Sequence, residues 1–587
     1  MAIIHFSGTQ LEPIKASAPL NRKFMFAFGF IFIIAMHFFM PNPGGTGIDV
    51  PFNAASWIGL SLALAIGLFQ TANNQKLRFS RLTIGLFLCV LIISLPILYA
   101  NAASFAALPR LSGLWSGFLL FLLLQQFQLS NKYKQQLLWM IVLATLIESV
   151  LGYIQFLLLP ADNHFAYDVS INRPYGIFQQ PDVMASFLAT GMLLSGYLLA
   201  RQQRKYGRKV THVSLLYLVP SLTLPLIVVL ASRTGWIGAV LGVLTILPYL
   251  LRFSTRKRLL GWGISVLVGI SAGLILGSTS EQTTKMITEQ AGLQSERLQT
   301  LPQTLDMLIE RPFTGYGYGR FEAAYMLYTA RQHQLNPAYP SGMQAMEHPH
   351  NELLFWGVEG GLIPVLGIML TAGLVLLKIY SARKGTRLAM LGLFIPLVLH
   401  TQLASPFYHS VMHWVIFIVL LFWVDQRTAT YYFQPFSRVA RVVLKLTAVL
   451  LPLCISAYML TALHTNYVLT RFEQSGAHPA QLSGVSNPFA WKERYERDTL
   501  RADLLLGLQD HNPALIQPYI DWSQDIIREK PRAELYADLI LAYLGMGEQS
   551  KARQVETEAR LLFPEFTYSQ EKEPVSEKNN PAEKTER

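Results

Sequence analysis

The chain has 587 residues, of which 52% are hydrophobic and only 14% are charged, and its formal net charge is +12. A soluble globular domain usually carries about 25% charged residues. The apolar residues come in repeated runs of about 17–25, long enough to cross a membrane as helices. We therefore predict an all-α, polytopic membrane protein, because a β-barrel would show short alternating segments instead. Cys89 and Cys454 both lie inside apolar runs, which indicates neither a disulfide framework nor a thiolate zinc site.

About thirteen segments are expected to span the membrane. They are 24–40, 52–69, 82–99, 111–127, 137–159, 183–200, 213–231, 235–251, 259–277, 353–377, 388–404, 408–424 and 442–461. Arg22 and Lys23 precede the first segment, which lacks an obvious small-residue cleavage site. We therefore interpret that segment as a retained anchor rather than a cleaved signal peptide.

Basic residues cluster in alternate connections between these segments, which predicts the orientation of the chain. The positive-inside rule places the N-terminus and these clusters in the cytoplasm, so the positive charge does not indicate nucleic-acid binding. Four other connections then fall on the outer face, which would be the periplasm of a Gram-negative cell. They are the loop around 160–182, the turn 232–234, the long loop 278–351 and the turn 405–407.

The resulting organisation has six parts. They are a cytoplasmic N-terminus (1–23), a first membrane part (24–277), a large periplasmic loop carrying the candidate active site (278–351), a second membrane part (352–462), a periplasmic helical domain (463–570) and a disordered tail (571–587). Within the helical domain, the residues from Ala533 to Pro564 resemble one tetratricopeptide hairpin with Gly547 at its turn. A generic helical pair is the alternative, and either structure is a candidate surface for a protein partner.

The stretch His348-Pro349-His350-Asn351-Glu352 closes the long loop and opens directly onto an apolar run. Polar groups at such a position serve either to cap a helix or to carry out chemistry on a lipid-borne substrate. We favour the second interpretation, because ionisable groups at membrane depth are usually functional.

Arginines on the outer face suggest an anion site. Arg233 lies between two apolar runs, where its charge is costly unless it reaches the surface, forms a salt bridge or meets an anion. The long loop adds Arg297, Arg311 and Arg320, and the 160–182 loop adds Arg173 and Gln180. A glycine-rich turn at 312–319 has backbone amides that are able to bind a phosphate or a sugar. Several forked cations beside a histidine fit the recognition of a diphosphate.

Other chemistries lack the residues they need. The chain has no GxxxxGK[ST] loop for ATP. His348 and His350 do not have the spacing of an HExxH zinc site, and no acidic cluster favours magnesium. A cation pathway would need carboxylates within the spans, for which Glu148 and Glu359 are about the only candidates.

The order of these motifs resembles the O-antigen ligase and polymerase superfamily, and within it the PglL-type bacterial protein O-oligosaccharyltransferases. The motifs are Ser-Arg-Thr-Gly at 232–235, an arginine that opens a helix at 297, Arg-Pro-Phe-Thr-Gly-Tyr-Gly-Tyr-Gly at 311–319, and His-Asn at 350–351 followed by Gly360-Gly361. The segment 173–182 is similar to the Gln-Pro-Asn segment of that subgroup. The resemblance covers about residues 20–465.

The resemblance implies a glycan donor on undecaprenyl diphosphate, a large periplasmic loop over the site, and transfer without a metal or other cofactor. It implies that His350 is the essential histidine, that Arg233 and Arg297 hold the diphosphate, and that Gln180 contacts substrate. Arg173, Arg311, Arg320 and Asn351 are weaker candidates for substrate binding. Tyr408 matches a tyrosine of the subgroup, but the Glu-Tyr-Pro expected before it is replaced by Leu-Ala-Ser-Pro.

We expect His350 to accept the proton of a serine or threonine hydroxyl as that oxygen attacks the anomeric carbon, with inversion. The helical tail favours a pilin-like protein as the acceptor. An O-antigen ligase acting on lipid A core and an O-antigen polymerase remain alternatives. A lipid or glycan transporter is the alternative from another class.

Overall fold

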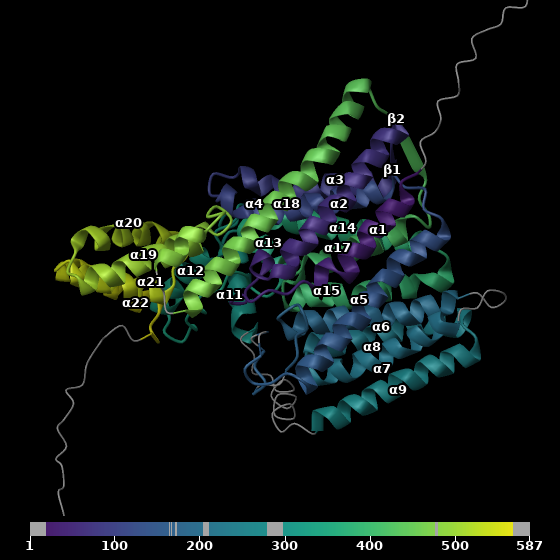
Figure 1. Cartoon of the computed structure of the whole chain (residues 1–587), viewed down its shortest axis with the longest axis horizontal. Coiled ribbons are helices and arrows are strands. Elements are labelled where there is room, and N and C mark those ends of the chain that lie inside the picture. Colours follow the sequence, from purple (N-terminus) through teal and green to yellow (C-terminus); the bar gives the residue numbers. More distant parts are fainter. Residues whose placement is uncertain are drawn as a thin grey trace, which may run out of the picture. The chain divides into compact units, whose positions relative to one another are not determined.

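The computed structural model describes residues 19–163, 165, 167–170, 173–202, 210–278, 297–475 and 479–566. The chain divides into two compact units (Figure 1). The membrane unit comprises Met1–Phe321 and His348–Thr499, and the tail unit comprises Glu322–Glu347 and Leu500–Arg587.

The membrane unit is built almost entirely of helices. They are α1 (Asn21–Ile33), α2 (Pro51–Asn74), α3 (Arg81–Ser94), α4 (Ser104–Leu124), α5 (Asn131–Leu157), α6 (Pro181–Arg201), α7 (Val210–Val229), α8 (Arg233–Phe253), α9 (Arg256–Ser278), α11 (Arg297–Glu310), α13 (Glu352–Gly360), α14 (Leu362–Ser381), α15 (Arg387–Leu403), α16 (Pro406–His409), α17 (Val411–Asp425) and α18 (Arg438–Gln474). Helices α12 (Phe321–Leu335) and α19 (Lys492–Gln509) each cross from one unit into the other.

Eleven helices in the described part of the chain are long and apolar enough to cross a membrane. They coincide with eleven of the thirteen predicted spans, and the spans predicted at 24–40 and 408–424 contain the shorter helices α1 and α17. The all-α, polytopic membrane fold is therefore confirmed.

Helix α6 lies at the centre of the membrane unit. It packs against α5, α7, α8 and α15, and the apolar part of α6 is entirely buried. By contrast, α9 and α18 leave most of their apolar surface exposed. A helix that is apolar on all sides and still exposed is stable only when lipid covers it, which fits the membrane assignment.

Polar caps and prolines define where the helices begin. Ser80, Ser130, Ser232 and Ser437 each accept a hydrogen bond from a backbone N–H of the helix that follows. A proline begins α2 and α6, where its missing N–H costs nothing. These residues fix where each helix begins, so the polar groups that precede the apolar runs lie at the helix ends.

The segment 353–377, which we predicted to be one span, is broken into α13 and α14 at Gly361. Gly361 has φ +71°, a conformation that favours glycine. The N–H of Leu362 donates to the carbonyl of Pro312 at 2.7 Å instead of continuing the helix. The loop thus bonds to the break, and α13 becomes a short separate helix that begins just after His350.

A two-stranded antiparallel sheet, β1 (Lys76–Ser80) with β2 (Tyr431–Pro435), was not predicted. Arg78 lies 3.7 Å from the ring centre of Tyr431, and Lys76 lies 4.6 Å from that of Phe433. Lys76 and Arg78, which belong to a basic cluster that predicts the orientation, thus also help to join the connection before α3 to the one before α18.

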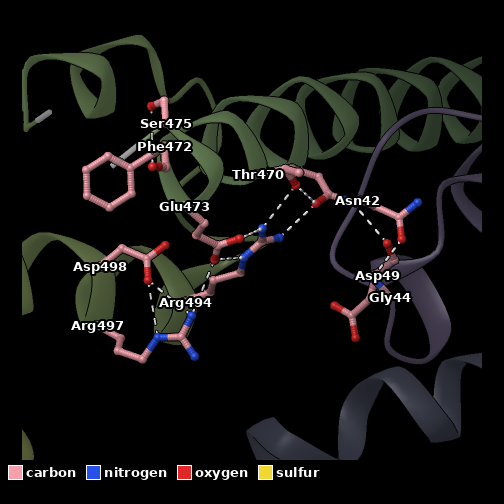
Figure 2. A network of polar contacts seen from close by, with 11 residues as sticks. Asn42, Gly44, Asp49, Thr470, Phe472, Glu473, Ser475, Arg494, Arg497 and Asp498 are labelled. Atoms are coloured by element: carbon pink, nitrogen blue, oxygen red, sulfur yellow. Dashed lines mark hydrogen bonds and ion pairs between the residues drawn. The ribbon is translucent and has the colours of Figure 1, made fainter. Parts of the chain in front are cut away.

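Helix α18 continues to Gln474, well past the predicted span 442–461, and a polar network holds its end (Figure 2). Arg494 donates to the carboxylate of Glu473 from Nε at 2.8 Å and from Nη2 at 2.7 Å. Its Nη1 donates to Asn466 at 2.7 Å, and Asn466 donates to the carbonyl of Asp49 at 3.1 Å. The network therefore joins α18 and α19 to the loop that precedes α2.

The membrane unit extends beyond residue 463, where the helical domain was predicted to begin. Residues up to Thr499 belong to the membrane unit, because α18 runs on and the segment after it bonds back to it. Trp491, for example, donates to the carbonyl of Ala462 at 2.8 Å. The predicted tail at 571–587 lies outside the described residues.

The tail unit contains α20 (Pro513–Glu529), α21 (Ala533–Gly545) and α22 (Gln549–Leu562), which pack in sequence. Helices α21 and α22 form a packed pair, which both interpretations of residues 533–564 expected, and Gly547 takes φ +77° in the turn between them. Arg532 forms ion pairs with Glu322 at 2.7 Å and Glu347 at 3.2 Å, which ties α12 and the end of the long loop to these helices.

We expect Arg494→Ala to destabilise the end of α18. It would leave the carboxylate of Glu473 and the amide of Asn466 without their shared donor, at a cost of about 2 kcal/mol. The midpoint of thermal unfolding should fall, and cleavage between 475 and 491 by an added protease should accelerate. Lys492→Ala is the matched control, because its exposed pair with Glu496 contributes little. Equal effects of the two substitutions would contradict the assignment.

Candidate functional site

Four polar segments that are distant in the sequence are joined by direct contacts at the ends of their helices. The first contact links the 173–182 loop to the turn before α8. Arg173 donates from Nε to the carbonyl of Leu230 at 2.6 Å and pairs with Asp182 at 3.5 Å. The guanidinium of Arg173 is therefore used to hold the turn from which Arg233 projects.

Further contacts bring in the other two segments. His409 donates from Nε2 to the carbonyl of Phe178 at 2.7 Å, which joins the turn after α15 to the 173–182 loop. The ring of His348 lies 5.7 Å from the ring of Tyr408. Asn351 donates to the carbonyl of Gln402 at 3.0 Å. The predicted outer-face segments thus meet in one place.

The packing of α8 against α15 brings Arg233 to the same end. A Cβ built on Gly238 would lie 3.2 Å from Pro396, and one built on Gly392 would lie 2.4 Å from Thr245. The two helices are therefore antiparallel. The start of α8, at Arg233, therefore lies level with the last turn of α15. The carbonyl of Gln402 in that turn accepts the hydrogen bond from Asn351.

Backbone strain collects in these segments. Six described residues other than glycine have positive φ, and three of them lie in these segments of the membrane unit: Gln179 at 57°, Ala231 at 47° and His350 at 51°. Such conformations are costly for residues with a side chain and concentrate at functional sites. Ala231 precedes the Arg233 turn by one residue, and His350 is itself the predicted catalytic residue.

His348 and His350 form the centre of the site, with their rings 4.9 Å apart. Burial, reinforced by the neighbouring charge of His350, lowers the pKa of His348 to about 3. His348 is therefore a neutral imidazole at physiological pH. Its buried Nδ1 has no hydrogen-bond partner among the described residues.

Asn351 and Glu352 begin α13. The side chain of Asn351 caps the helix by accepting from the N–H of Leu354 at 2.9 Å. Burial raises the pKa of the Glu352 carboxyl from 4.5 to about 7, against the opposing effects of Arg110 and of hydrogen bonds from Trp356 and the turn at 407–408. The helix cap that the sequence suggested is thus present and is formed by Asn351. It does not explain why the carboxyl of Glu352 is buried.

Arg110, on α4, is the main residue that sequence analysis missed. It pairs with Glu359 on α13, and the two side chains are 11% and 2% exposed. The guanidinium also lies 4.2 Å from the ring centre of Phe355 and 4.1 Å from that of Trp356. Like Arg233, Arg110 lies next to an apolar run on the predicted outer face, directly before the predicted span 111–127, where its charge is costly without a partner.

Amides of the glycine-rich turn at 312–319 already donate hydrogen bonds within the protein. The N–H groups of Tyr316 and Gly317 donate to the carbonyls of Val358 and Glu359 at 2.8 and 2.9 Å. The N–H of Gly319 donates to the Glu359 carboxylate at 3.0 Å. The predicted phosphate-binding turn is therefore a docking element for α13.

The other predicted site residues make fewer contacts with these segments. Gln180 is exposed at the start of α6. Arg311 is exposed and lies 4.6 Å from the ring centre of Tyr316, and Arg320 is also exposed. Arg297 is the first residue of α11, and its side chain lies outside what the structure describes. Within the described ranges, no three His, Cys, Asp or Glu residues form a group able to hold a metal ion.

Three family models match the chain. A protein glycosylation ligase model matches residues 174–199, an O-antigen ligase model matches 216–369, and the C-terminal model of virulence factor membrane-bound polymerases matches 388–577. These ranges contain Gln180, Arg233, Arg297, His350 and Tyr408. The chain therefore belongs to the superfamily of membrane-embedded O-antigen ligases and polymerases.

A curated relative narrows the group. A general O-oligosaccharyltransferase of Acinetobacter baylyi is 26% identical over 199 residues, which are 32% of this chain and 33% of the relative. The match thus spans about a third of the relative's length. Together with the protein glycosylation ligase model, this similarity supports a PglL-type member of the superfamily.

We expect the buried carboxyl of Glu352 to make stability depend on pH. Its pKa is higher in the folded state than in the unfolded chain, so its favourable contribution is fully present below pH 4.5 and is lost as the pH rises to about 7. Glu352→Gln cannot ionise. The unfolding midpoint of the wild type should therefore fall relative to that of the variant over this interval. Parallel pH curves would contradict the burial of the carboxyl, and Glu310→Gln, at an exposed position, is the control.

Proposed function

We propose that this protein transfers a preassembled oligosaccharide from undecaprenyl diphosphate to serine and threonine hydroxyls of exported, pilin-like proteins. The observation that carries the proposal is the convergence of a histidine on strained backbone with arginine-bearing segments at one end of the membrane helices. The three family models and the Acinetobacter relative support the class of reaction.

In this mechanism His350 is the general base. The hydroxyl oxygen of the acceptor forms a bond to the anomeric carbon while His350 takes its proton. The bond from that carbon to the diphosphate oxygen breaks, and the electron pair leaves with the lipid diphosphate. An imidazole with an ordinary pKa of about 6.5 suits this proton transfer. One displacement inverts the anomeric centre, and no metal takes part.

Arg233 and Arg297 stabilise the departing diphosphate. Arg233 begins α8, so its charge adds to the positive end of the helix dipole. The next residue, Thr234, has a buried hydroxyl for which the described residues provide no partner. Forked guanidinium donors suit the equatorial oxygens of a phosphate. This arrangement supplies the charge stabilisation that the leaving group needs.

The remaining candidates have supporting roles. Gln180, Asn351 and Tyr408 contact the substrates, and Arg311 and Arg320 supply positive charge around the entrance. Arg173 acts as a positioning residue rather than a substrate ligand, because its guanidinium binds Leu230 and Asp182.

The protein lies in the bacterial inner membrane with its N-terminus in the cytoplasm, so the site and the tail unit face the periplasm. The alternating basic clusters support this orientation. The tail unit is then available to an exported acceptor. It has a cavity of about 500 Å³ whose lining includes Leu327, Tyr536, Leu539 and Tyr543. Aromatic and aliphatic groups of this kind suit a protein partner.

We expect His350→Ala to lower glycan transfer by at least about a hundredfold, since general base catalysis contributes this much or more. The assay uses cells that contain a lipid-linked glycan and a tagged pilin-like acceptor, with mass spectrometry of the acceptor as the readout. His212→Ala, at an exposed position on α7, is the control. Transfer at the wild-type rate by His350→Ala would exclude the base role. An unmodified acceptor with altered lipopolysaccharide or longer glycan chains would instead indicate a ligase or a polymerase.

Arg233→Glu should abolish transfer with every acceptor, because it places negative charge beside the diphosphate. Arg233→Lys keeps the charge but loses the fork, and should lower kcat/KM for the donor roughly tenfold. Arg252→Glu reverses a charge at the other end of the same helix and serves as the matched control. A loss confined to one acceptor would contradict a role in binding the donor.

A further inference from the structure

Arg110, which packs against α13, and Glu352, at the start of α13, have buried polar atoms that the proposed mechanism does not use. Nε and Nη1 of Arg110 are buried, and no described residue accepts from them. Oε1 of Glu352 is also buried and has no donor within the described part of the chain. Leaving such groups unsatisfied is costly, so a protein retains them when a ligand or a solvent molecule completes them.

The two side chains are held on one face of α13. Glu352, Trp356 and Glu359 follow each other at helical spacing along that face. Arg110 pairs with Glu359 through Nη2 and lies 4.1 Å from the ring centre of Trp356, while Trp356 donates to the Glu352 carboxyl. The position of the Arg110 guanidinium is therefore fixed, and the N–H directions of Nε and Nη1 are set in advance.

We propose that Arg110 and Glu352 form a subsite for a sugar of the donor glycan, in which Arg110 donates to one hydroxyl and Glu352 accepts from a neighbouring one. This inference rests on the proposed function for the identity of the glycan. It adds a specificity-determining pair to the residues that hold the diphosphate and remove the proton.

A sugar fits this pair better than a phosphate does. The charge of Arg110 is already balanced by Glu359, and Glu352 brings no positive charge to attract an anion. A sugar ring is neutral and presents neighbouring hydroxyls, each of which both donates and accepts. Arg233 begins α8, where the helix dipole favours an anion, so the diphosphate and the sugar are proposed to be recognised by chemically different parts.

Binding of three probes to the full-length protein in lipid nanodiscs tests the subsite. The probes are polyprenyl diphosphate N-acetylglucosamine and its 3-deoxy and 4-deoxy analogues, and His350→Ala is present throughout to prevent turnover. We expect one deoxy analogue to bind about tenfold to a hundredfold more weakly than the parent. Glu352→Gln should weaken the parent by a similar factor and leave that analogue unchanged.

Two further variants separate recognition from folding. Arg110→Lys keeps the charge near Glu359 but removes the fork, and it should weaken the parent more than the analogue that lacks its hydroxyl. Glu310→Gln should change the binding of neither the parent nor the analogue. If Glu352→Gln weakens all three probes equally, or if both analogues bind as well as the parent, the subsite is excluded. Because binding is read without transfer, failure of the acceptor reaction would overturn the proposed function and leave this result standing.

Discussion

The buried ion pair between Arg110 and Glu359 is the contact on which the site depends. It ties α4 to α13, and the Glu359 carboxylate also accepts from the N–H groups of Gly319 and Phe321. Removing one partner of a buried pair costs about 3–5 kcal/mol, because the other charge stays buried. The pair thus holds α13, which begins at Glu352. It also keeps the segment 312–321 against the C-terminal end of α13, where Gly361 ends the helix.

A membrane restricts where such a site is able to form. Backbone groups in the hydrocarbon core must be satisfied within helices, so irregular backbone survives only at helix ends or inside the protein. Here α6, α8, α13 and α17 all begin at the polar end, and the connections before them carry left-handed residues such as Gln179, Ala231 and His350. Contacts between the connections offset that strain, which lets the chain hold reactive side chains in fixed positions.

Much of this arrangement was predictable from local patterns. Hydropathy located the spans, and the basic clusters selected the connections that prove to be in contact, since both signals depend on residues near each other in the chain. The break at Gly361 and the hydrogen bonding of the 312–319 turn were not predictable, because each depends on a partner distant in the sequence. The break depends on the carbonyl of Pro312, and the turn depends on carbonyls of α13. Arg110 was available to the same reasoning as Arg233, but it stood at the edge of a span rather than between two polar neighbours.

The arginines of the polar end show why residue type alone does not assign a role. Arg110 and Arg173 each lie against a carboxylate, and Arg173 also donates to main-chain carbonyls, so their charges are balanced within the protein. Arg233 instead begins a helix, where the backbone adds positive potential rather than cancelling it. Under the proposed function, a diphosphate leaving group responds to positive charge and to the helix dipole, whereas a sugar responds to directed hydrogen bonds. The same side chain is therefore suited to different parts of one donor according to what the fold places beside it.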